Sequence, residues 1–583
     1  MIYNQALIIF NRNTPEQPRE RTTVGAVLHS DSTPVARPSS RRKLTSLAVV
    51  CAALLVALLA AGCGNTYRPV VVAIAPVGPA GQPTKYAVAI SSAGPTANGL
   101  VTIVDFSGDT ILDTTLIGLN PYYFILANSS EGETLNSDGT LTSFDISTSL
   151  IESQVLQSTL FPNSSAVSMT QAGSSLYIAE AGRDAVAQAT GLPPGIIQEF
   201  PTTLPPIYTI GISGAPRVFS LVPAATPASN GSSVTIDTTS NTVTNTIPVG
   251  INPTYGVMTS DTRRAFILNQ GSNNVTVINA QANALDTFYS NGCNPANTTP
   301  CTVTSTIPAG VAPVWADFAP TLDELVIANQ GPPQFAINSY SIAGNVATFQ
   351  TSAQGLTAGQ KLTLFNFPSS SFFNNQTVTV AATGLSPTSF QIPFLHANVA
   401  STTEAANGVG NGSITIVSIP LCSQTTVTTN PNCDPSNPID AVGFGTVVAT
   451  IPVGPHPVMV GVLQDGSEAF VANAGVPCSP TPTSCTASIG QAGTPGSVSV
   501  INLSTDTVVA TVPGIGQSAS IETDAYVHGH PTYIGVTTGS PTGKAYVVSS
   551  DSTDLTIIRS DINAIQTHLS LQGYGVSLRM TSP

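Results

Sequence analysis

The 583-residue sequence predicts an all-β fold, a ring of repeated four-stranded sheets (a β-propeller) that carries a small inserted β module. Charged residues make up 8% of the chain, against about 25% in ordinary globular proteins, whereas glycine and proline number 48 and 46. Short runs of Val, Ile and Thr alternate with turn residues along most of the sequence. One composite motif also recurs at a spacing typical of a propeller blade.

The recurring motif is a short segment that ends in Gly and is followed at once by X-X-Pro. Its best copies are Thr246–Gly250, Thr306–Gly310 and Thr450–Gly454, with Pro253, Pro313 and Pro457 after them. Each copy continues with an apolar strand, a polar turn and a second strand that ends in Asn, at Asn269, Asn329 and Asn473. Two further strands complete the unit. Four β-branched strands in about 40–45 residues are typical of one blade.

These residues resemble the YVTN-type β-propeller repeat family, which is related in fold to lactonase-like propellers. The resemblance is strong over 232–331 and 447–514, recognisable over 530–573 and degenerate over 84–225. The family's Tyr-Val-Thr-Asn signature is absent, and the nearest forms are Phe470–Asn473 and Tyr546–Ser549. The resemblance implies a fold and no particular reaction.

Seven blades are expected over 120–158, 164–202, 206–250, 252–310, 312–454, 456–514 and 530–573. An eighth set, 84–117, offers three strands and lacks an inner one. The C-terminal segment Tyr574–Met580 has no blade of its own, so it could supply that strand, close the ring and remove the open sheet edges. The count is therefore eight, with seven as the alternative because 164–202 is the weakest unit.

An insertion between Ile342 and Gly412 has its own strand pattern, over 346–351, 361–367, 376–382 and 389–393. We expect a small β module, weakly similar to the β-sandwich inserts of phage-tail and surface proteins; the alternative is a long hairpin. The expected organisation is a leader and signal peptide (1–62), a tether (63–83), the first part of the propeller (84–342), the module (343–411) and the second part of the propeller (412–583).

The N-terminal segment has the pattern of an export signal. Seven of the 17 basic residues precede the apolar run Leu47–Ala61. This run is shorter than a membrane-spanning helix, which needs about 20 residues. Leu58–Cys63 resembles a bacterial lipobox, which implies cleavage before Cys63, acylation of its thiol, and an outer-membrane or periplasmic lipoprotein that could reach the cell surface. The alternatives are an uncleaved anchor or a chance cysteine.

Six downstream cysteines form three pairs that are local in sequence: Cys293 and Cys301, Cys422 and Cys433, Cys478 and Cys485. Six cysteines allow fifteen connectivities, but this clustering favours three local disulfides, which suit an oxidising compartment. Zinc is the alternative. The spacing is not Cys-x-x-Cys, however, and no histidine is close in sequence.

Three histidines are candidate metal ligands. His456 and His530 each precede the proline that opens an inner strand, so they should lie on one face near the central channel, where His528 could join them. Other repeats carry Asn120, Asn252 and Ala312 at this position. An ordinary loop histidine is therefore the favoured interpretation, and we expect no metal, no other cofactor and no catalytic residue. Trp315 is expected in the core, and Tyr122 and Tyr123 could line the channel.

The charge balance disfavours nucleic-acid binding, because 17 Lys and Arg stand against 31 Asp and Glu. The sequence contains no nucleophile elbow, phosphate loop, haem-attachment motif or EF-hand. The expected function is a lipid-anchored binding or protein-interaction module of the cell envelope, with an envelope protein or a glycan as partner. The alternatives are a lactonase- or dehydrogenase-like propeller enzyme that uses His456, His530 and nearby acids, or a passive surface-layer or adhesion component.

Overall fold

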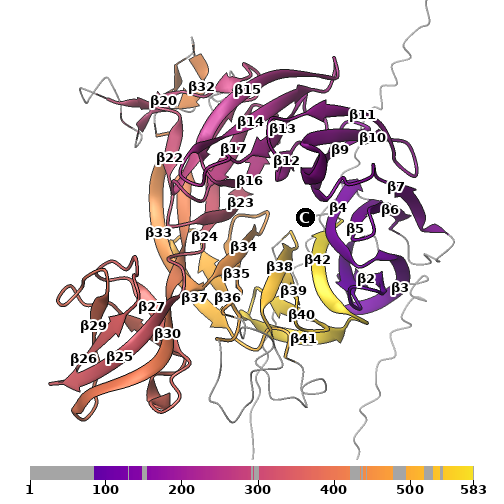
Figure 1. Ribbon diagram of the computed structural model, residues 1–583. Helices are drawn as coiled ribbons and strands as arrows, with labels where there is room; N and C mark the ends of the chain where they lie inside the picture. Colours follow the sequence, from indigo (N-terminus) through magenta and orange to yellow (C-terminus); the bar gives the residue numbers. More distant parts are fainter. Residues whose placement is uncertain are drawn as a thin grey trace, which may run out of the picture. The chain divides into compact units, whose positions relative to one another are not determined.

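Eight antiparallel sheets of four main strands are arranged as a ring in the computed structural model (Figure 1). The structure describes residues 85–128, 130–146, 154–290, 293, 301–420, 433–434, 437–441, 443–476, 494–517, 529–538 and 543–581. They belong to a unit that spans Gln82–Pro583. Within these residues no helix has the length and apolar character needed to cross a membrane.

The blades are numbered from the one that contains both chain ends, and their strands run from inner to outer. Blade 1 is β42–β1–β2–β3 (Tyr574–Met580, Tyr86–Ser92, Asn98–Asp105, Thr110–Leu119), and blade 2 is β4–β5–β6–β7 (Pro121–Asn128, Glu131–Asn136, Thr140–Asp145, Leu156–Thr159). Blade 3 is β8–β9–β10–β11 (Ala166–Ala172, Ser175–Glu180, Ala185–Thr190, Gly195–Pro201), and blade 4 is β12–β13–β14–β15 (Tyr208–Ile210, Arg217–Val222, Asn230–Asp237, Thr242–Ile251). Blade 5 is β16–β17–β18–β22 (Pro253–Met258, Arg264–Asn269, Asn274–Asn279, Thr306–Pro308), and blade 6 is β23–β24–β30–β33 (Pro313–Ala319, Glu324–Asn329, Val399–Ser418, Thr446–Pro455). Blade 7 is β34–β35–β36–β37 (Pro457–Val462, Glu468–Asn473, Ser497–Asn502, Thr507–Val512), and blade 8 is β38–β39–β40–β41 (Pro531–Val536, Lys544–Ser549, Asp554–Arg559, Ala564–Ser570).

The ring is closed by the C-terminal strand, as the sequence predicted. β42 pairs with β1 in antiparallel register, with Leu578 opposite Ala89. The Thr581 N–H donates to the Tyr86 carbonyl, and the Tyr86 N–H donates to Thr581 Oγ1. Each inner strand contacts the inner strand of the next blade, and β42 contacts both β38 and β4. The predicted count of eight is therefore confirmed over seven, because β8–β11 form a complete sheet.

The repeated Gly and Asn of the motif depend on each other. The buried Asn269 side chain donates to Thr276 Oγ1 of the neighbouring strand (2.9 Å) and accepts from the Gly250 N–H (3.0 Å). A Cβ atom at Gly250 would lie 2.6 Å from Cγ of that asparagine, so no larger residue fits without displacing it. Gly310 with Asn329 and Gly454 with Asn473 repeat the close approach, but the Gly310 N–H donates to Thr415 Oγ1 in place of the asparagine. The motif thus joins the outer strand of one blade to the second strand of the next.

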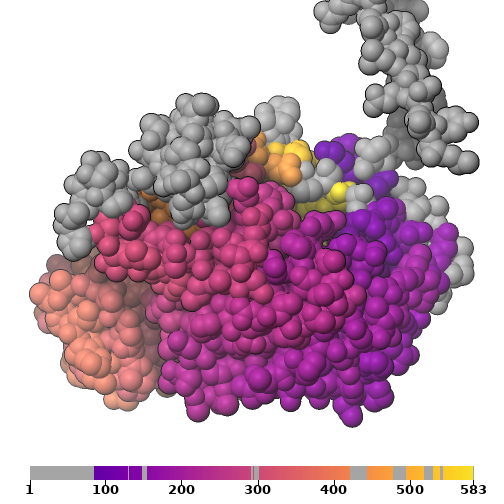
Figure 2. Space-filling model, turned by 90° about the horizontal axis from the view of Figure 1, so that it is seen from above, coloured from indigo at the N-terminus to yellow at the C-terminus, as the bar shows by residue number. Residues whose placement is uncertain are grey.

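The inserted module shares a strand with blade 6. The second half of the 20-residue strand β30 pairs with β24 and β33, whereas its first half pairs with β25 (Phe335–Ala343) and β27 (Lys361–Phe365). The module also contains β26 (Val346–Thr351), β28 (Gln376–Thr379), β29 (Ser389–Pro393) and the one-turn helix η4 (Ser371–Phe373). Its buried side chains form a core of their own, so the hairpin alternative is wrong. The module begins at Phe335, before the expected residue 343, because β25 pairs with β26 inside the module. Figure 2 shows the module as a lobe (salmon to orange) beside the blades.

Two buried or part-buried cations of the ring, Lys544 and Arg264, have carboxylate partners. Lys544 of β39 reaches the β2–β3 turn, where its Nζ lies 2.8 and 2.7 Å from the two carboxylate oxygens of Asp109. Tyr546 also donates to Asp109 (2.8 Å). The fully buried Arg264 pairs with Asp286 at 2.5 Å (Nε–Oδ2). The Lys544–Asp109 pair links blade 8 to blade 1 and so adds a polar contact to the ring closure.

Candidate functional site

A cluster of aromatic side chains lies inside the ring, and a sequence pattern places it there. In five blades an aromatic residue stands two positions after the proline that precedes or opens the inner strand: Tyr123, Tyr208, Tyr255, Trp315 and Tyr533. In four of these strands the pairing register shifts between the proline and the aromatic residue. Such a bulge re-aims the side chain that follows it. We call these five residues and Arg579 the axial cluster.

Contacts between blades that are not neighbours show that the axial cluster faces the inside of the ring. Tyr208 and Tyr255 have ring centroids 5.0 Å apart, and Tyr255 stacks on Trp315 at 4.1 Å. Trp315 of blade 6 in turn meets the edge of Tyr533 of blade 8 at 5.7 Å, past blade 7. Tyr255 is 9% exposed, and the other members are partly exposed. Trp315 therefore packs against the core, as predicted, and also belongs to a lining that solvent can reach.

Arg579 brings a positive charge into this aromatic lining. It lies on the closing strand β42, its guanidinium carbon is 4.2 Å from the ring centroid of Tyr533, and its Nη1 donates to the Leu578 carbonyl at 3.1 Å. Burial lowers the pKa of Arg579, but a guanidinium keeps its proton in proteins. Among the described residues no carboxylate lies within ion-pair distance of it. Its described contacts are the face of the Tyr533 ring and the Leu578 carbonyl.

The phenols of the axial cluster stay protonated at neutral pH. Burial raises the pKa of Tyr123, Tyr208 and Tyr255, and this effect outweighs the opposing charge of Arg579. A protonated phenol can donate one hydrogen bond. The cluster therefore combines one fixed cation with several O–H groups and flat apolar surfaces.

Asp317 follows Trp315 by two residues on β23 and is the acid closest in sequence to the axial cluster. Its carboxylate accepts the N–H of Val462 in the next blade and its own neighbour's N–H at Phe318, both at 2.9 Å. Burial raises the pKa of Asp317 to about 6, against the lowering effect of these two hydrogen bonds. The negative charge of Asp317 also contributes to the raised pKa of Tyr255, whereas it is not among the causes that shift the pKa of Arg579.

The candidate histidines do not assemble a metal site in the described part of the chain. His530 is buried, its Nδ1 lies 2.6 Å from Asp551 Oδ2 and its Nε2 lies 3.2 Å from the Thr494 carbonyl. His456 has a left-handed backbone (φ 57°), as do Asn120, Asn252 and Ala312 at the same repeat position, and burial lowers its pKa. His528 lies outside the described residues. No group of three His, Cys, Asp or Glu among those described could hold a metal ion.

Burial alone would raise the pKa of Asp551, but the hydrogen bonds and charge of His530 lower it. One ring nitrogen of His530 faces Asp551 and the other faces the Thr494 carbonyl, so both are engaged within the fold. This pairing makes a structural role for His530 the simplest interpretation, and it weakens the enzyme alternative that used it.

One of the three expected disulfides is confirmed. Cys293 and Cys301 are bonded, with Cα atoms 5.8 Å apart, in the loop between β18 and β22. That loop also carries the short strands β20 (Phe288–Tyr289) and β21 (Val303–Thr304). Cys422, Cys478 and Cys485 lie outside the described residues, as does Cys63, and the Cys433 side chain is not described. Their pairing and acylation stay predictions.

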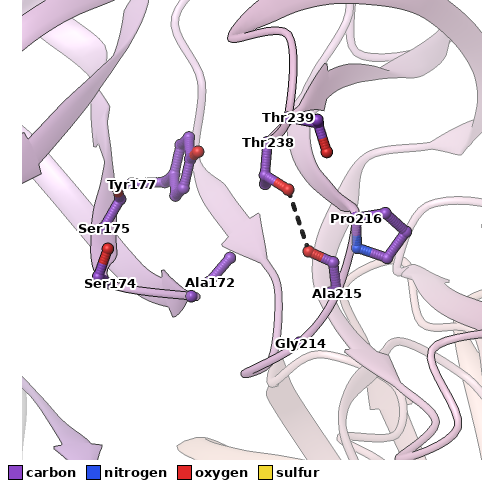
Figure 3. A pocket seen from close by; sticks show the side chains of 10 residues that line it. Ala172, Ser174, Ser175, Tyr177, Gly214, Ala215, Pro216, Thr238 and Thr239 are labelled. Carbon is purple, nitrogen blue, oxygen red and sulfur yellow. Dashed lines mark hydrogen bonds between the residues drawn. The ribbon is translucent and has the colours of Figure 1, made fainter. Parts of the chain in front are cut away.

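A separate pocket of about 390 Å³ opens between blades 3 and 4 (Figure 3). Its walls come from the β8–β9, β12–β13 and β14–β15 turns, and its side chains are small or hydroxylated apart from Tyr177. Thr238 Oγ1 donates to the Ala215 carbonyl at 3.2 Å across one wall. No described charged side chain lines it, so it offers shape and hydroxyl groups but no fixed charge.

The axial cluster was only partly foreseen from the sequence. Tyr123 and Trp315 were singled out from the sequence. The pattern Pro-X-aromatic, visible for example at Pro253-Thr254-Tyr255, would also have found the three other aromatic members. No local signal marks Arg579. It reaches the cluster because ring closure brings the C-terminal strand beside β1.

The geometry defines the class of the protein as an eight-bladed β-propeller with an aromatic axial cluster. No protein-family model matches the sequence, and no curated protein matches it. Among solved structures the chain is similar to Kuenenia stuttgartiensis hydrazine synthase (12% identity, TM-score 0.39, 71% of this chain and 89% of that chain). It is also similar to dihydro-heme d1 dehydrogenase NirN in complex with DHE (10%, 0.43, 87% and 78%) and to a putative 6-phosphogluconolactonase from Bacteroides fragilis (8%, 0.37, 86% and 99%). We base no functional argument on these similarities.

Proposed function

We propose that this chain is a lipid-anchored β-propeller of the cell envelope that binds a ligand at its axial cluster. The observation that carries the proposal is the cluster itself: aromatic side chains from five blades, four of them partly exposed, share the inside of the ring with a cation that has no described acidic partner. Aromatic rings offer large contact surfaces at small conformational cost, and they are typical of binding sites.

The proposed location rests on sequence features. Leu58–Cys63 resembles a lipobox, and the confirmed Cys293–Cys301 disulfide suits an oxidising compartment. The repeat resembles the YVTN-type family, which adds an expected fold but no ligand. An envelope protein or a glycan remains the proposed partner, since either can present groups to an open face of the ring.

The experiment has two arms. Intact-mass analysis of the full chain from the membrane fraction should show cleavage before Cys63 and acylation of its thiol, and a Cys63→Ala variant should lack the lipid mass. A pull-down from envelope extract should then retain a component with the wild-type chain and lose it with Trp315→Leu. An unprocessed N-terminus would refute the anchor. Identical retention by both chains would refute the axial site.

Asp317 favours a second candidate, a lactonase-like hydrolase. A carboxylate with a pKa of about 6 beside the axial cluster is suited to general-base catalysis near neutral pH. A lactone-hydrolysis screen of the wild-type chain and Asp317→Asn would test it. Activity that rises through pH 6 and disappears in the variant would support this candidate, and no turnover by the wild type would dismiss it.

A further inference from the structure

We propose that the axial cluster binds a flat organic carboxylate, whose carboxylate pairs with Arg579 and whose apolar body lies against the aromatic rings. The inference rests on the proposed function, because it names the ligand chemistry of the same site. The charge of Arg579, the phenol hydroxyls of the axial cluster and its aromatic rings each favour this class of ligand.

The charge is the first argument. A desolvated cation is costly unless a negative group compensates it. Two other buried or part-buried cations of the ring obey this rule: Lys544 faces Asp109, and Arg264 faces Asp286. Arg579 has only a backbone carbonyl and the face of Tyr533 among the described residues. A bound anion would supply the compensation that the fold provides at the other two cations.

The donors are the second argument. Tyr123, Tyr208 and Tyr255 carry hydroxyls in the same axial lining, where hydrogen bonds link Tyr208 to Tyr123 and to Tyr255. Because burial holds the pKa of each phenol above its usual value, they keep their protons and can donate to an anion. A guanidinium with neighbouring O–H donors matches the planar oxygens of a carboxylate, which arginine binds through two parallel hydrogen bonds.

The surfaces are the third argument. Tyr255, Trp315 and Tyr533 form a connected series of rings next to Arg579, and stacking or edge contacts with them favour a flat apolar ligand. One arginine is the cluster's single cation. A carboxylate carries one charge, so it matches the site better than a phosphate dianion, which would leave charge uncompensated in a partly buried place.

Trp315 makes the site directly observable, because it is the one tryptophan of the chain. The full chain would be titrated with benzoate while tryptophan emission is recorded, and the same titration would use benzamide, which has the same shape without the charge. Inorganic phosphate supplies charge without a flat body. We expect saturable change with benzoate, and at least tenfold weaker responses to benzamide and phosphate.

Variants separate a bound carboxylate from an indirect effect. Arg579→Gln should weaken benzoate about 10- to 100-fold, as expected for a lost charged hydrogen bond, and Arg579→Lys should retain part of the affinity. Arg183→Gln, which removes an arginine already paired with Glu199, should bind like the wild type. Circular dichroism and melting curves would establish that each variant is folded.

Each result has one meaning for the proposal. Equal benzoate binding by wild type and Arg579→Gln, or no saturable response in the wild type, would overturn it. Equal affinities for benzoate and benzamide would also overturn it, since charge would then play no part. Tighter binding of phosphate than of benzoate would replace the carboxylate with a phosphate ligand. An envelope component captured in the pull-down alongside a negative titration would leave the proposed function standing while this inference fails.

Discussion

The junction of blades 8 and 1 and the ring axis treat buried positive charge in opposite ways. At the junction, Lys544 lies 2.7 Å from an oxygen of Asp109 and also donates to the Phe106 carbonyl at 2.9 Å. At the axis, Arg579 lies against a tyrosine ring and donates to one carbonyl. The first arrangement is complete within the fold. The second has no carboxylate within ion-pair distance among the described residues, which is the basis of the proposed anion site.

This difference indicates which parts of the molecule serve stability and which serve binding. A paired charge between blades fixes their relation and closes the ring. An unpaired cation in a partly exposed lining costs stability, and proteins retain such features where function uses them.

The largest effect should follow from deletion of residues 574–583. This change removes the inner strand of blade 1, including the fully buried Leu578, and leaves β1 with an open edge. We expect a loss of about 5 kcal/mol or more, which is comparable to the whole stability of many domains. Thermal melting would measure it, with a chain that lacks only residues 582–583 as control. An unchanged melting temperature would refute the closure.

A smaller loss should follow when the junction is made to resemble the axis. Asp109→Asn leaves the Lys544 ammonium without a carboxylate, and breaking a buried pair in this way costs about 3–5 kcal/mol. Denaturant unfolding would measure the change. Asp561→Asn, at the exposed pair with Arg559, should cost at most about 1 kcal/mol. Adding Lys544→Met to Asp109→Asn should restore part of the loss. If Asp109→Asn and Asp561→Asn cost the same stability, burial of the Lys544–Asp109 pair is unimportant.

A third way of handling buried charge is to remove it by protonation. Glu133 is 1% exposed, and burial raises its pKa from 4.5 to about 8, against the hydrogen bond donated by Ser143. The folded chain therefore holds this proton more tightly than the unfolded chain does. The free energy of unfolding should consequently fall as the pH rises from about 4.5 to 8.

Glu133→Gln keeps an acceptor for Ser143 and has no charge to bury. We expect it to be about 1–3 kcal/mol more stable than the wild type above pH 8 and equally stable below pH 4.5, so that its pH profile is flatter. Urea unfolding at a series of pH values would show this. Parallel profiles for the two proteins would mean that Glu133 is not protonated by burial. Glu180 and Glu324, whose pKa values burial also raises, should account for a remaining slope.

The fold was largely predictable because each blade repeats the same local chemistry. The Gly and Asn of the motif contact each other directly, so they recur together in the sequence, and β26 and β29 coincide with the expected strands 346–351 and 389–393. The eighth blade was predictable because a C-terminal strand without a sheet and three strands without an inner partner complement each other. The start of the module at Phe335 was missed, because β25 continues the local strand pattern of the blade.

The site was less predictable, for a physical reason. Histidines at repeated positions suggested a common location, but side-chain partners decided their role: His530 is held by Asp551 and Thr494, which are distant in sequence. Arg579 is more than 300 residues from Tyr255 and Tyr208 and carries no motif. That no described carboxylate pairs with it is a property of three-dimensional packing, which a pattern of residue types does not encode.

The stability of Arg579→Met tests the central claim that this cation is kept for binding and not for the fold. Methionine preserves much of the side-chain volume and removes the charge. The free energy of unfolding, measured by denaturant titration without ligand, should equal or exceed that of the wild type, because no carboxylate in the described part of the chain loses its partner. A loss of about 3 kcal/mol or more, like that expected for Asp109→Asn, would show that Arg579 is a structural residue and would contradict the account.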